Sequence, residues 1–280
     1  MTTYEFLEAV HLAYEPRSYL EIGVKTGRSL ALSRTRTIAV DPEPEITSEI
    51  VCDLELVQTT SDEFFARDDA LERFPEGRVD LAFVDGLHLV EFALRDFINV
   101  ERHTDWTSVI VLDDVLPRGP VESRRERGEK RIWTGDVFKI GEVLARHRPD
   151  LLLLLVDTEP TGVLLVLGCD PRNTVLAERY DSIVSEYATP DPQDVPLAIT
   201  TRETALEPSS VAGANVWAEL RRARGSGLSR EAGWDAVCRS VESAVRPAAR
   251  RAPGSASRRR PDDRRDPRWP GRLRRALRGL

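Results

Sequence analysis

Residues 1–170 alternate short apolar runs with stretches of helical periodicity, and this alternation constrains the fold more than any other feature of the chain. It is typical of βαβ units, in which a helix crosses between two parallel strands. The apolar runs predict parallel strands at residues 19–24, 37–41, 49–53, 79–85 and 108–113. Helices are expected from residue 61 onward and over residues 89–102 and 137–146. We therefore predict an α/β fold with a doubly wound sheet.

Two further apolar runs, residues 151–157 and 162–168, are joined by a connection too short for a crossover helix. The connection contains Pro160, so we predict an antiparallel hairpin that completes a mostly parallel, seven-stranded sheet. The expected division of the chain is a core over residues 1–172, a loop and helical appendage over residues 173–246, and an Arg/Pro-rich tail over residues 247–280. We expect helices at 216–224 and 231–245 in the appendage, and disorder in the tail.

The charge of the chain is unevenly distributed. Residues 246–280 hold 13 Arg and three Asp, so this tail carries +10 and the rest of the chain −17, which together give the net charge of −7. An acidic body disfavours nucleic acid as a partner, because phosphate contacts need a basic face. In the tail, Trp269 and three leucines recur at helical spacing between arginines. This pattern also suits an anionic membrane surface or an acidic partner, although the disordered, non-catalytic interpretation is favoured.

The cysteines and the longest apolar run indicate the cellular compartment of the protein. Cys52, Cys169 and Cys238 are widely spaced and form no CxxC pair, which suits a reducing cytoplasm. No leader-like segment opens the sequence, and its longest unbroken apolar run, residues 151–156, is too short to span a bilayer. We therefore expect a cytoplasmic protein without stable membrane insertion.

A glycine turn follows the first predicted strand. Gly23 and Gly27 let the backbone approach a ligand that a Cβ would block, with Glu21 before the turn and Ser29 after it, where a helix is expected to begin. The GxxxG spacing is not the GxGxxG of nicotinamide enzymes, and by itself it fits a plain strand-to-helix turn equally well. Asp41 ends the next strand 20 residues after Glu21, where an acidic side chain can accept both ribose hydroxyls of an adenosine. These features together predict an adenosine-binding site.

Two polar residues follow the third predicted strand. Ser61 and Asp62 lie where the edge of an adenine ring would sit. They are equally suited to cap a helix, because their side-chain oxygens can accept hydrogen bonds from free backbone amides.

Carboxylates also follow the fourth and fifth predicted strands. Asp85 ends one strand with His88 three residues later, and Asp113 and Asp114 end the next. Such strand ends meet at the ligand-binding edge of a doubly wound sheet, where converging carboxylates need a cation or protons between them. Oxygen ligands suit Mg²⁺, and His88 could take a proton from a substrate hydroxyl. Single residues of this kind are more often helix caps or structural histidines, but the set predicts a metal site.

Trp133 and Asp136 lie in a segment that follows an arginine-rich loop. Trp133 could stack on a sugar or aromatic ring of a substrate, with Asp136 nearby. Alternatively, Trp133 packs under the loop and Asp136 caps the helix that follows.

These residues resemble a known family. The glycine turn, Asp41, the 85–88 segment and the 113–114 pair are similar to class I S-adenosylmethionine (SAM) dependent methyltransferases of the methyltransferase 24 type, in particular the macrocin and mycinamicin sugar O-methyltransferases. The resemblance implies SAM as cofactor, with Glu21 near its methionine end. It further implies Mg²⁺ on Asp85, Asp113 and Asp114, with His88 as general base.

The same resemblance implies O-methylation of a small hydroxylated acceptor, a sugar or another secondary metabolite. Asp113 stands where the sugar enzymes tend to have Glu, and we expect no counterpart of the long N-terminal assembly domain that some of those enzymes have. The acceptor, the choice of O- over N-methylation, the metal and the possibility of a homo-oligomer therefore stay open. A non-catalytic adenosine-binding scaffold and a nicotinamide oxidoreductase are the alternatives.

Overall fold

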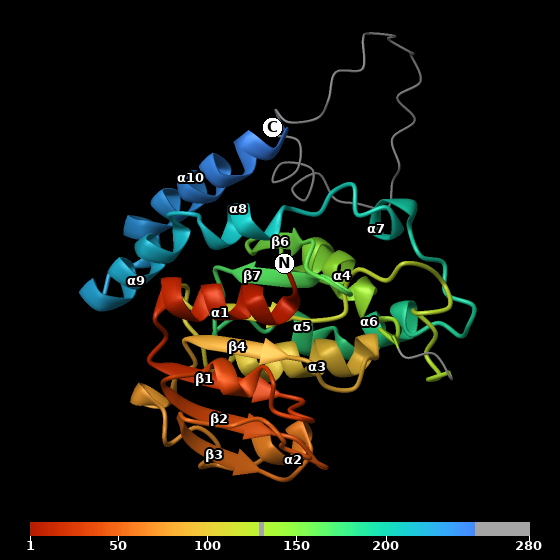
Figure 1. Cartoon of the computed structure of the whole chain (residues 1–280), viewed down its shortest axis with the longest axis horizontal. Coiled ribbons are helices and arrows are strands. Elements are labelled where there is room, and N and C mark those ends of the chain that lie inside the picture. The colour runs from red at the N-terminus through yellow and green to blue at the C-terminus, as the bar shows by residue number, and fades with distance from the viewer. Residues whose placement is uncertain (129–131, 250–280) are drawn as a thin grey trace, which may run out of the picture.

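A seven-stranded sheet forms the centre of the molecule (Figure 1). The structure is a computed structural model that describes residues 1–128 and 132–249. The strand order is β3-β2-β1-β4-β5-β7-β6. β1 to β5 are parallel, and β7 runs antiparallel to both β5 and β6. The strands are β1 (Ser18–Ile22), β2 (Arg36–Val40), β3 (Asp53–Val57), β4 (Leu81–Val84), β5 (Val109–Leu112), β6 (Leu152–Val156) and β7 (Val163–Leu167). The predicted doubly wound sheet with its antiparallel hairpin is confirmed.

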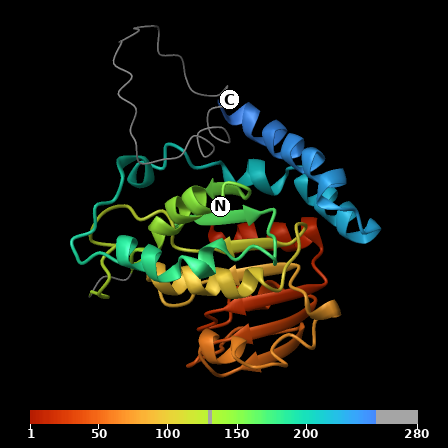
Figure 2. The same cartoon turned by 180° about the vertical axis from the view of Figure 1, so that it is seen from behind.

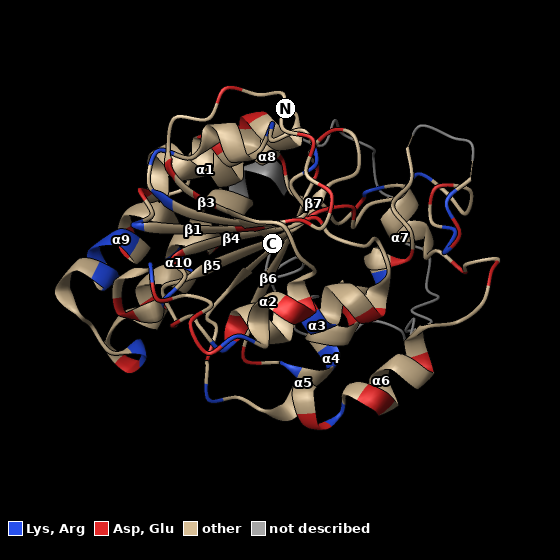
Figure 3. Cartoon of the chain, turned by 90° about the horizontal axis from the view of Figure 1, so that it is seen from below, with Lys and Arg blue, Asp and Glu red and all other residues tan. Residues whose placement is uncertain are grey.

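Helices cover both faces of the sheet, which explains why its central strands are continuous apolar runs. Every residue of β1, β4, β5 and β7 is buried. Figure 3 shows the strands between two helical layers, with α1 and α8 on one side and α3 to α6 on the other. The second layer faces the viewer in Figure 2. It consists of α3 (Val90–Glu101), α4 (Ile140–His147), α5 (Val175–Glu178) and α6 (Tyr180–Tyr187).

The other face is covered by α1 (Thr3–Tyr14), α8 (Pro208–Ala212), α9 (Val216–Ser226) and α10 (Arg230–Ala249). Phe6, Trp217 and Val241 share one apolar cluster with the strands on this face. α9 and α10 confirm the two helices predicted in the appendage. α1 was not predicted, although its capping box is visible in the sequence: Thr2 accepts from the backbone of Glu5, and the Glu5 side chain accepts from the backbone of Thr2.

The third strand was predicted in the wrong place. It spans Asp53–Val57 and pairs in register with Arg36–Val40, whereas residues 49–52 form a loop. Ile50 and Ile46 are apolar because they pack against Gly27 of the glycine turn. Thr47 N–H donates to the Thr26 carbonyl and fastens this loop to the turn. The real strand alternates acidic and apolar residues, which is typical of a partly exposed edge strand.

The helix expected after the glycine turn is reduced to a 3₁₀ turn at Leu30–Leu32. Residues 23–27 are used by the turn, where Gly23, Lys25 and Gly27 all have positive φ. Few residues are then left before β2 begins at Arg36, so the connection closes without a longer helix.

The remaining helices are close to their predicted positions. α2 (Ser61–Phe65) begins at Ser61, as expected, and α4 follows a 3₁₀ turn at Val137–Lys139. Within the expected loop and helical appendage over residues 173–246, the structure also forms the short helices α7 (Leu197–Thr200) and α8 before α9. The expectations for the arginine-rich tail lie almost wholly outside the described residues, which end at residue 249.

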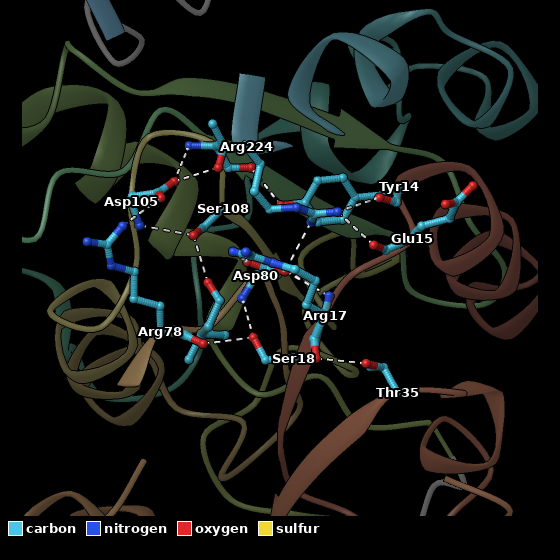
Figure 4. A network of polar contacts seen from close by, with 12 residues as sticks. Tyr14, Glu15, Arg17, Ser18, Thr35, Arg78, Asp80, Asp105, Ser108 and Arg224 are labelled. Atoms are coloured by element: carbon cyan, nitrogen blue, oxygen red, sulfur yellow. Dashed lines mark hydrogen bonds and ion pairs between the residues drawn. The ribbon is translucent and has the colours of Figure 1, made fainter. Parts of the chain in front are cut away.

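A network of polar contacts fastens α9 to the amino-terminal edge of the sheet (Figure 4). Arg224 lies 3.1 Å from a carboxylate oxygen of Asp80 and donates to the backbone carbonyls of Tyr14 and Glu15. Arg17 binds the same carboxylate through its backbone N–H and its guanidinium. Arg224 and Asp80 are each only 6% exposed, so this ion pair is screened little by water.

Candidate functional site

The glycine turn lies against the end of β4. Gly23 has φ +84°, and a Cβ at this position would be 1.9 Å from the backbone oxygen of Asp85. Only glycine therefore permits this approach. The contact joins the turn to the acidic residues that follow β4 and β5, so the two groups predicted from sequence form one site.

Glu21 supports the turn from inside the protein. Its side chain is fully buried, and its two oxygens accept hydrogen bonds of 2.7 Å from the hydroxyls of Tyr19 and Ser29. Burial raises the pKa of Glu21 to about 8, against the opposing effect of these hydrogen bonds. Glu21 and Ser29 thus tie β1 to the chain after Gly27 and do not line an open surface.

Asp41 fastens the turn to the end of β2. One of its carboxylate oxygens accepts from the backbone N–H groups of Val24 at 2.7 Å and Lys25 at 2.9 Å. The other accepts from Glu43 N–H at 2.7 Å. A carboxylate offers about four acceptor positions, so these bonds leave capacity for a ligand hydroxyl. Asp41 is partly exposed at this edge.

Ser61 and Asp62 connect α2 to α3. The helix is capped by Thr60, whose hydroxyl accepts from Glu63 N–H. Asp62 pairs with Arg95 at 2.7 Å, and the Ser61 side chain hydrogen-bonds Asp96. Ser61 is therefore the first residue of the helix and not its cap.

Asp85, His88 and Asp114 come together at the carboxyl ends of β4 and β5. His88 Nε2 lies 3.3 Å from Asp85 Oδ1, and Nδ1 lies 2.7 Å from Asp114 Oδ2. One donor atom from each residue falls within 4.8 Å of the others. Asp114 has a left-handed backbone with φ +62°, an uncommon conformation outside glycine. These three residues belong to the four that the sequence predicts to converge at this edge.

Asp113 lies beside this group rather than in it. One of its carboxylate oxygens accepts from the backbone N–H of Asp114 at 2.9 Å. Asp113 lines the small pocket over the cluster together with Asp85, His88 and Asp114. The three donor atoms brought together thus include the histidine in place of the Asp113 carboxylate that was expected.

The environment of His88 fixes its tautomer. Nδ1 faces the carboxylate of Asp114 and, at 2.8 Å, the backbone oxygen of Trp133. Both neighbours only accept hydrogen bonds, so Nδ1 must carry hydrogen and Nε2 is the nitrogen that gains or loses a proton.

Charges in the cluster act strongly on one another. Burial lowers the pKa of His88, but the hydrogen bonds to Asp114 and Asp85 outweigh it and raise the pKa to about 11. Desolvation raises the pKa of Asp85, and desolvation with the charges of Asp114 and Asp85 raises that of Asp113 well above its usual range. Without another cation, protonated His88 is thus the counter-charge of the carboxylates. A bound cation would weaken their hold on its proton.

The tentative substrate residues have other contacts in the structure. Asp136 is fully buried; it accepts from Val90 N–H at the start of α3 and pairs with Arg125 at 2.7 Å and Lys139 at 3.0 Å. Asp136 therefore caps α3 and makes no side-chain cap for the 3₁₀ turn that follows it. Trp133 stacks on the ring of His88.

Tyr4 belongs near the site but was missed from the sequence. It lies in the first turn of α1, with the guanidinium carbon of Arg28 4.3 Å from its ring centroid. Burial raises the pKa of Tyr4, Arg28 lowers it, and the charges of Asp85 and Asp113 raise it further. The capping box of α1 could have revealed the helix, but no local signal shows that its start lies near this edge.

One family model matches a segment of the chain. Residues 20–115 match a family model described as a methyltransferase domain, of the methyltransferase 24 type. No curated protein matches the chain. Among the described residues, no helix is both long and apolar enough to cross a membrane.

Similar solved structures include three methyltransferases. The O-methyltransferase of Bacillus cereus, in complex with S-adenosylhomocysteine (SAH), is 15% identical over 58% of this chain and 79% of that chain, with a TM-score of 0.41. TomG of Streptomyces achromogenes is an O-methyltransferase of tomaymycin synthesis in complex with SAM. It is 19% identical over 61% of this chain and 82% of that chain, with a TM-score of 0.44. The SAH-bound methyltransferase PaMTH1 of Podospora anserina is 15% identical over 59% of this chain and 77% of that chain, with a TM-score of 0.45.

The matched segment contains every site residue that was predicted from the sequence except Trp133 and Asp136. It begins at Leu20, before the glycine turn, and ends at Val115, after the acidic pair. The glycine turn, Asp41 and the cluster of Asp85, His88 and Asp114 thus lie inside the segment that matches the methyltransferase-domain model.

Proposed function

We propose that this chain is a SAM-dependent O-methyltransferase that acts, with the help of Mg²⁺, on a small hydroxylated acceptor such as a sugar or another secondary metabolite. The observation that carries the proposal is the contact between Gly23 and Asp85. It places a turn suited to a nucleoside directly beside a cluster suited to a divalent cation.

The cofactor half of the site is assigned to the turn and the strand ends around it. Gly23 and Gly27 let the turn pack closely against Asp85 and against the loop of Ile46 and Ile50, and Asp41 has acceptor capacity for the ribose hydroxyls. Ser61 and Asp62 are proposed to lie at the adenine edge. Glu21 and Ser29 act from behind the turn: a cationic methionine end bound nearby would favour the charged form of Glu21, whose pKa burial raises to about 8.

The donor set fits a hard divalent cation. The donor atoms of Asp85, His88 and Asp114 already lie within 4.8 Å of one another, and Asp113 adds a carboxylate beside them. Asp85, Asp113 and Asp114 are the proposed Mg²⁺ ligands. Bound there, Mg²⁺ would lower the pKa of a coordinated acceptor hydroxyl and orient it.

His88 is the proposed general base. The acceptor oxygen forms a bond to the methyl carbon while the carbon–sulfur bond of the donor breaks, and the sulfur keeps that electron pair. The acceptor proton goes to Nε2 of His88, because Nδ1 already carries hydrogen toward Asp114 and Trp133. The products are the methyl ether and SAH.

Calorimetric titration tests the cofactor half of this proposal. The protein should bind SAM and SAH and show no heat with NAD. Binding of NAD alone would instead support the nicotinamide oxidoreductase.

A turnover assay then tests catalysis, with hydroxylated acceptors, Mg²⁺ and labelled SAM. Asp85→Asn should abolish transfer while SAH affinity and melting temperature stay close to those of the wild type. If SAM binds but no acceptor is methylated, and Asp85→Asn alters nothing, the chain is an adenosine-binding scaffold.

A further inference from the structure

Residues 133–136 lie along residues 88–90, and three contacts join the two segments. The Trp133 backbone oxygen faces His88 Nδ1 at 2.8 Å. Gly135, with φ +54°, packs so closely that a Cβ would be 1.5 Å from the His88 backbone oxygen. The Asp136 carboxylate accepts from Val90 N–H at 2.9 Å. This segment therefore holds the backbone and the side chain of His88 from one side.

The side chains of Trp133 and His88 form a parallel stack. Their ring centroids are 4.9 Å apart, and their planes differ by 9°. The indole N–H of Trp133 donates to the Arg124 carbonyl at 2.6 Å, and the Arg127 guanidinium lies 5.9 Å from the Trp133 ring centroid. The indole is thus held at its nitrogen and lies flat on the imidazole, although Trp133 is only partly buried.

The segment is itself anchored by ion pairs. Arg125 bridges Asp136 and Glu91, at 2.7 Å and 2.5 Å, and Lys139 pairs with Asp136 at 3.0 Å. Because Asp136 is fully buried, these charge-assisted bonds are strong and directional. These ion pairs therefore hold residues 133–136 in place beside His88.

A histidine ring needs such support because its outer torsion angle is soft. Rotation about χ2 has broad minima, and a half-turn exchanges the positions of the two ring nitrogens. In this structure the stack fixes the ring plane, and the Trp133 carbonyl together with Asp114 keeps Nδ1 as the donor. Nε2 is then left on the Asp85 side.

We propose that Trp133 is a positioning residue, which fixes the plane and the orientation of the His88 imidazole so that Nε2 faces the reacting hydroxyl. This inference rests on the proposed function, in which Nε2 accepts the proton. It gives Trp133 a different task from stacking on a substrate, because the ring in contact with its indole is the imidazole of the protein itself.

Nuclear magnetic resonance of the imidazoles tests the inference without turnover. The chain has four histidines, so the ¹⁵N-labelled rings can be assigned with one variant each. In the wild type, the ring protons of His88 should be shifted upfield by the indole, with Nδ1 protonated. Trp133→Leu should remove the upfield shift, and Trp133→Phe should keep most of it.

Kinetics give the second measurement. Misplacing a catalytic group by about 1 Å costs about 10²-fold in rate, so Trp133→Leu should lower kcat by about that factor with little change in the KM for SAM. Trp133→Phe should recover most of the rate. Trp106→Phe is the matched control, because Trp106 meets Trp234 edge to face away from His88, and it should change neither measurement.

Two outcomes would overturn the inference. Unchanged His88 signals in both folded Trp133 variants would show that the indole does not set the ring. A higher KM for the acceptor alone, with kcat and His88 signals intact, would make Trp133 a platform for the substrate. If His88 signals move as expected but the wild type methylates no acceptor, the proposed function fails while the positioning of His88 by Trp133 stands.

Discussion

Gly23 and Asp85 touch through their backbones, and no side chain can be added at Gly23 without meeting the Asp85 oxygen. The glycine turn after β1 and the acidic group after β4 are therefore one unit. A substitution that displaces the backbone at Gly23 should therefore also disturb the acidic group.

Gly23→Ala should damage both halves of the site. Alanine is strained at φ +84°, and its Cβ would lie 1.9 Å from the Asp85 oxygen, so the free energy of unfolding should fall by more than about 1 kcal/mol. SAH and Mn²⁺ should both bind more weakly by calorimetry. Gly77→Ala is the control, because Gly77 also has positive φ but has open space around it. Equal effects of the two variants would show that the contact with Asp85 is unimportant.

Asp41→Ala should weaken cofactor binding. It removes the acceptor for Val24 and Lys25 N–H, and hydrogen bonds to a charged group contribute about 1.5–3 kcal/mol each. The dissociation constant of SAH should therefore rise at least about tenfold. Asp69→Ala, which breaks the pair with Arg67 outside the site, provides the comparison. Unaltered SAH affinity in Asp41→Ala would exclude the ribose assignment.

Metal binding should depend on Asp85 and Asp114 more than on Asp113. The first two provide donor atoms within 4.8 Å of His88 Nδ1 or Nε2, whereas Asp113 lies beside the group. Mn²⁺ titrations followed by electron paramagnetic resonance should show the largest loss of affinity for Asp85→Asn and Asp114→Asn. A larger loss for Asp113→Asn would make Asp113 the main ligand of the proposed set. Turnover that survives exhaustive chelation would contradict a metal requirement altogether.

His11 should make the protein less stable in mild acid. Its ring is buried against Tyr19, and burial lowers its pKa from 6.5 to about 4. Between pH 6.5 and about pH 4, the unfolded chain binds a proton at His11 more readily than the folded protein does. The free energy of unfolding therefore falls as the pH falls through this window, by up to about 3 kcal/mol. Urea unfolding at pH 7 and pH 4.5 should show a smaller loss for His11→Phe than for the wild type. An identical loss would assign the acid sensitivity to other groups.

Replacing Asp80 should lower the free energy of unfolding more than replacing Arg224 does. Asp80→Ala leaves two guanidinium groups, from Arg17 and Arg224, without their carboxylate, and breaking a buried pair in this way costs about 3–5 kcal/mol. Arg224→Met should cost less, because Asp80 keeps Arg17. Denaturant unfolding of both single variants and the double variant measures the coupling. Additive single effects would mean that the pair is not coupled.

The sequence predicted the sheet well where each strand was a buried apolar run and failed where tertiary contacts used apolar residues differently. Ile50 looks like part of a strand, but it covers Gly27, so the third strand lies further along the chain. The shortened connection after the glycine turn could not be foreseen either, since Gly23, Lys25 and Gly27 use residues that could otherwise begin a helix.

The convergence of Asp85, His88 and Asp114 was predictable for a general reason: parallel strands present their carboxyl ends at one edge. The contacts of Trp133 and Asp136 were not predictable from the sequence. They depend on Arg125 and Lys139, which reach a carboxylate buried inside the protein. Tyr4 was missed for a similar reason, since its neighbour Arg28 belongs to a different element.

The packing of α1 has a consequence for the order in which the molecule is completed. Phe6, Leu7 and Val10 share their cluster with Trp217 and Leu220 of α9, and the carbonyls of Tyr14 and Glu15 are held by Arg224. During synthesis the ribosome releases α1 some two hundred residues before these partners exist. The helix that carries Tyr4 to the edge of the site therefore reaches its final packing late. Until then, the nascent sheet presents one apolar face to chaperones and proteases.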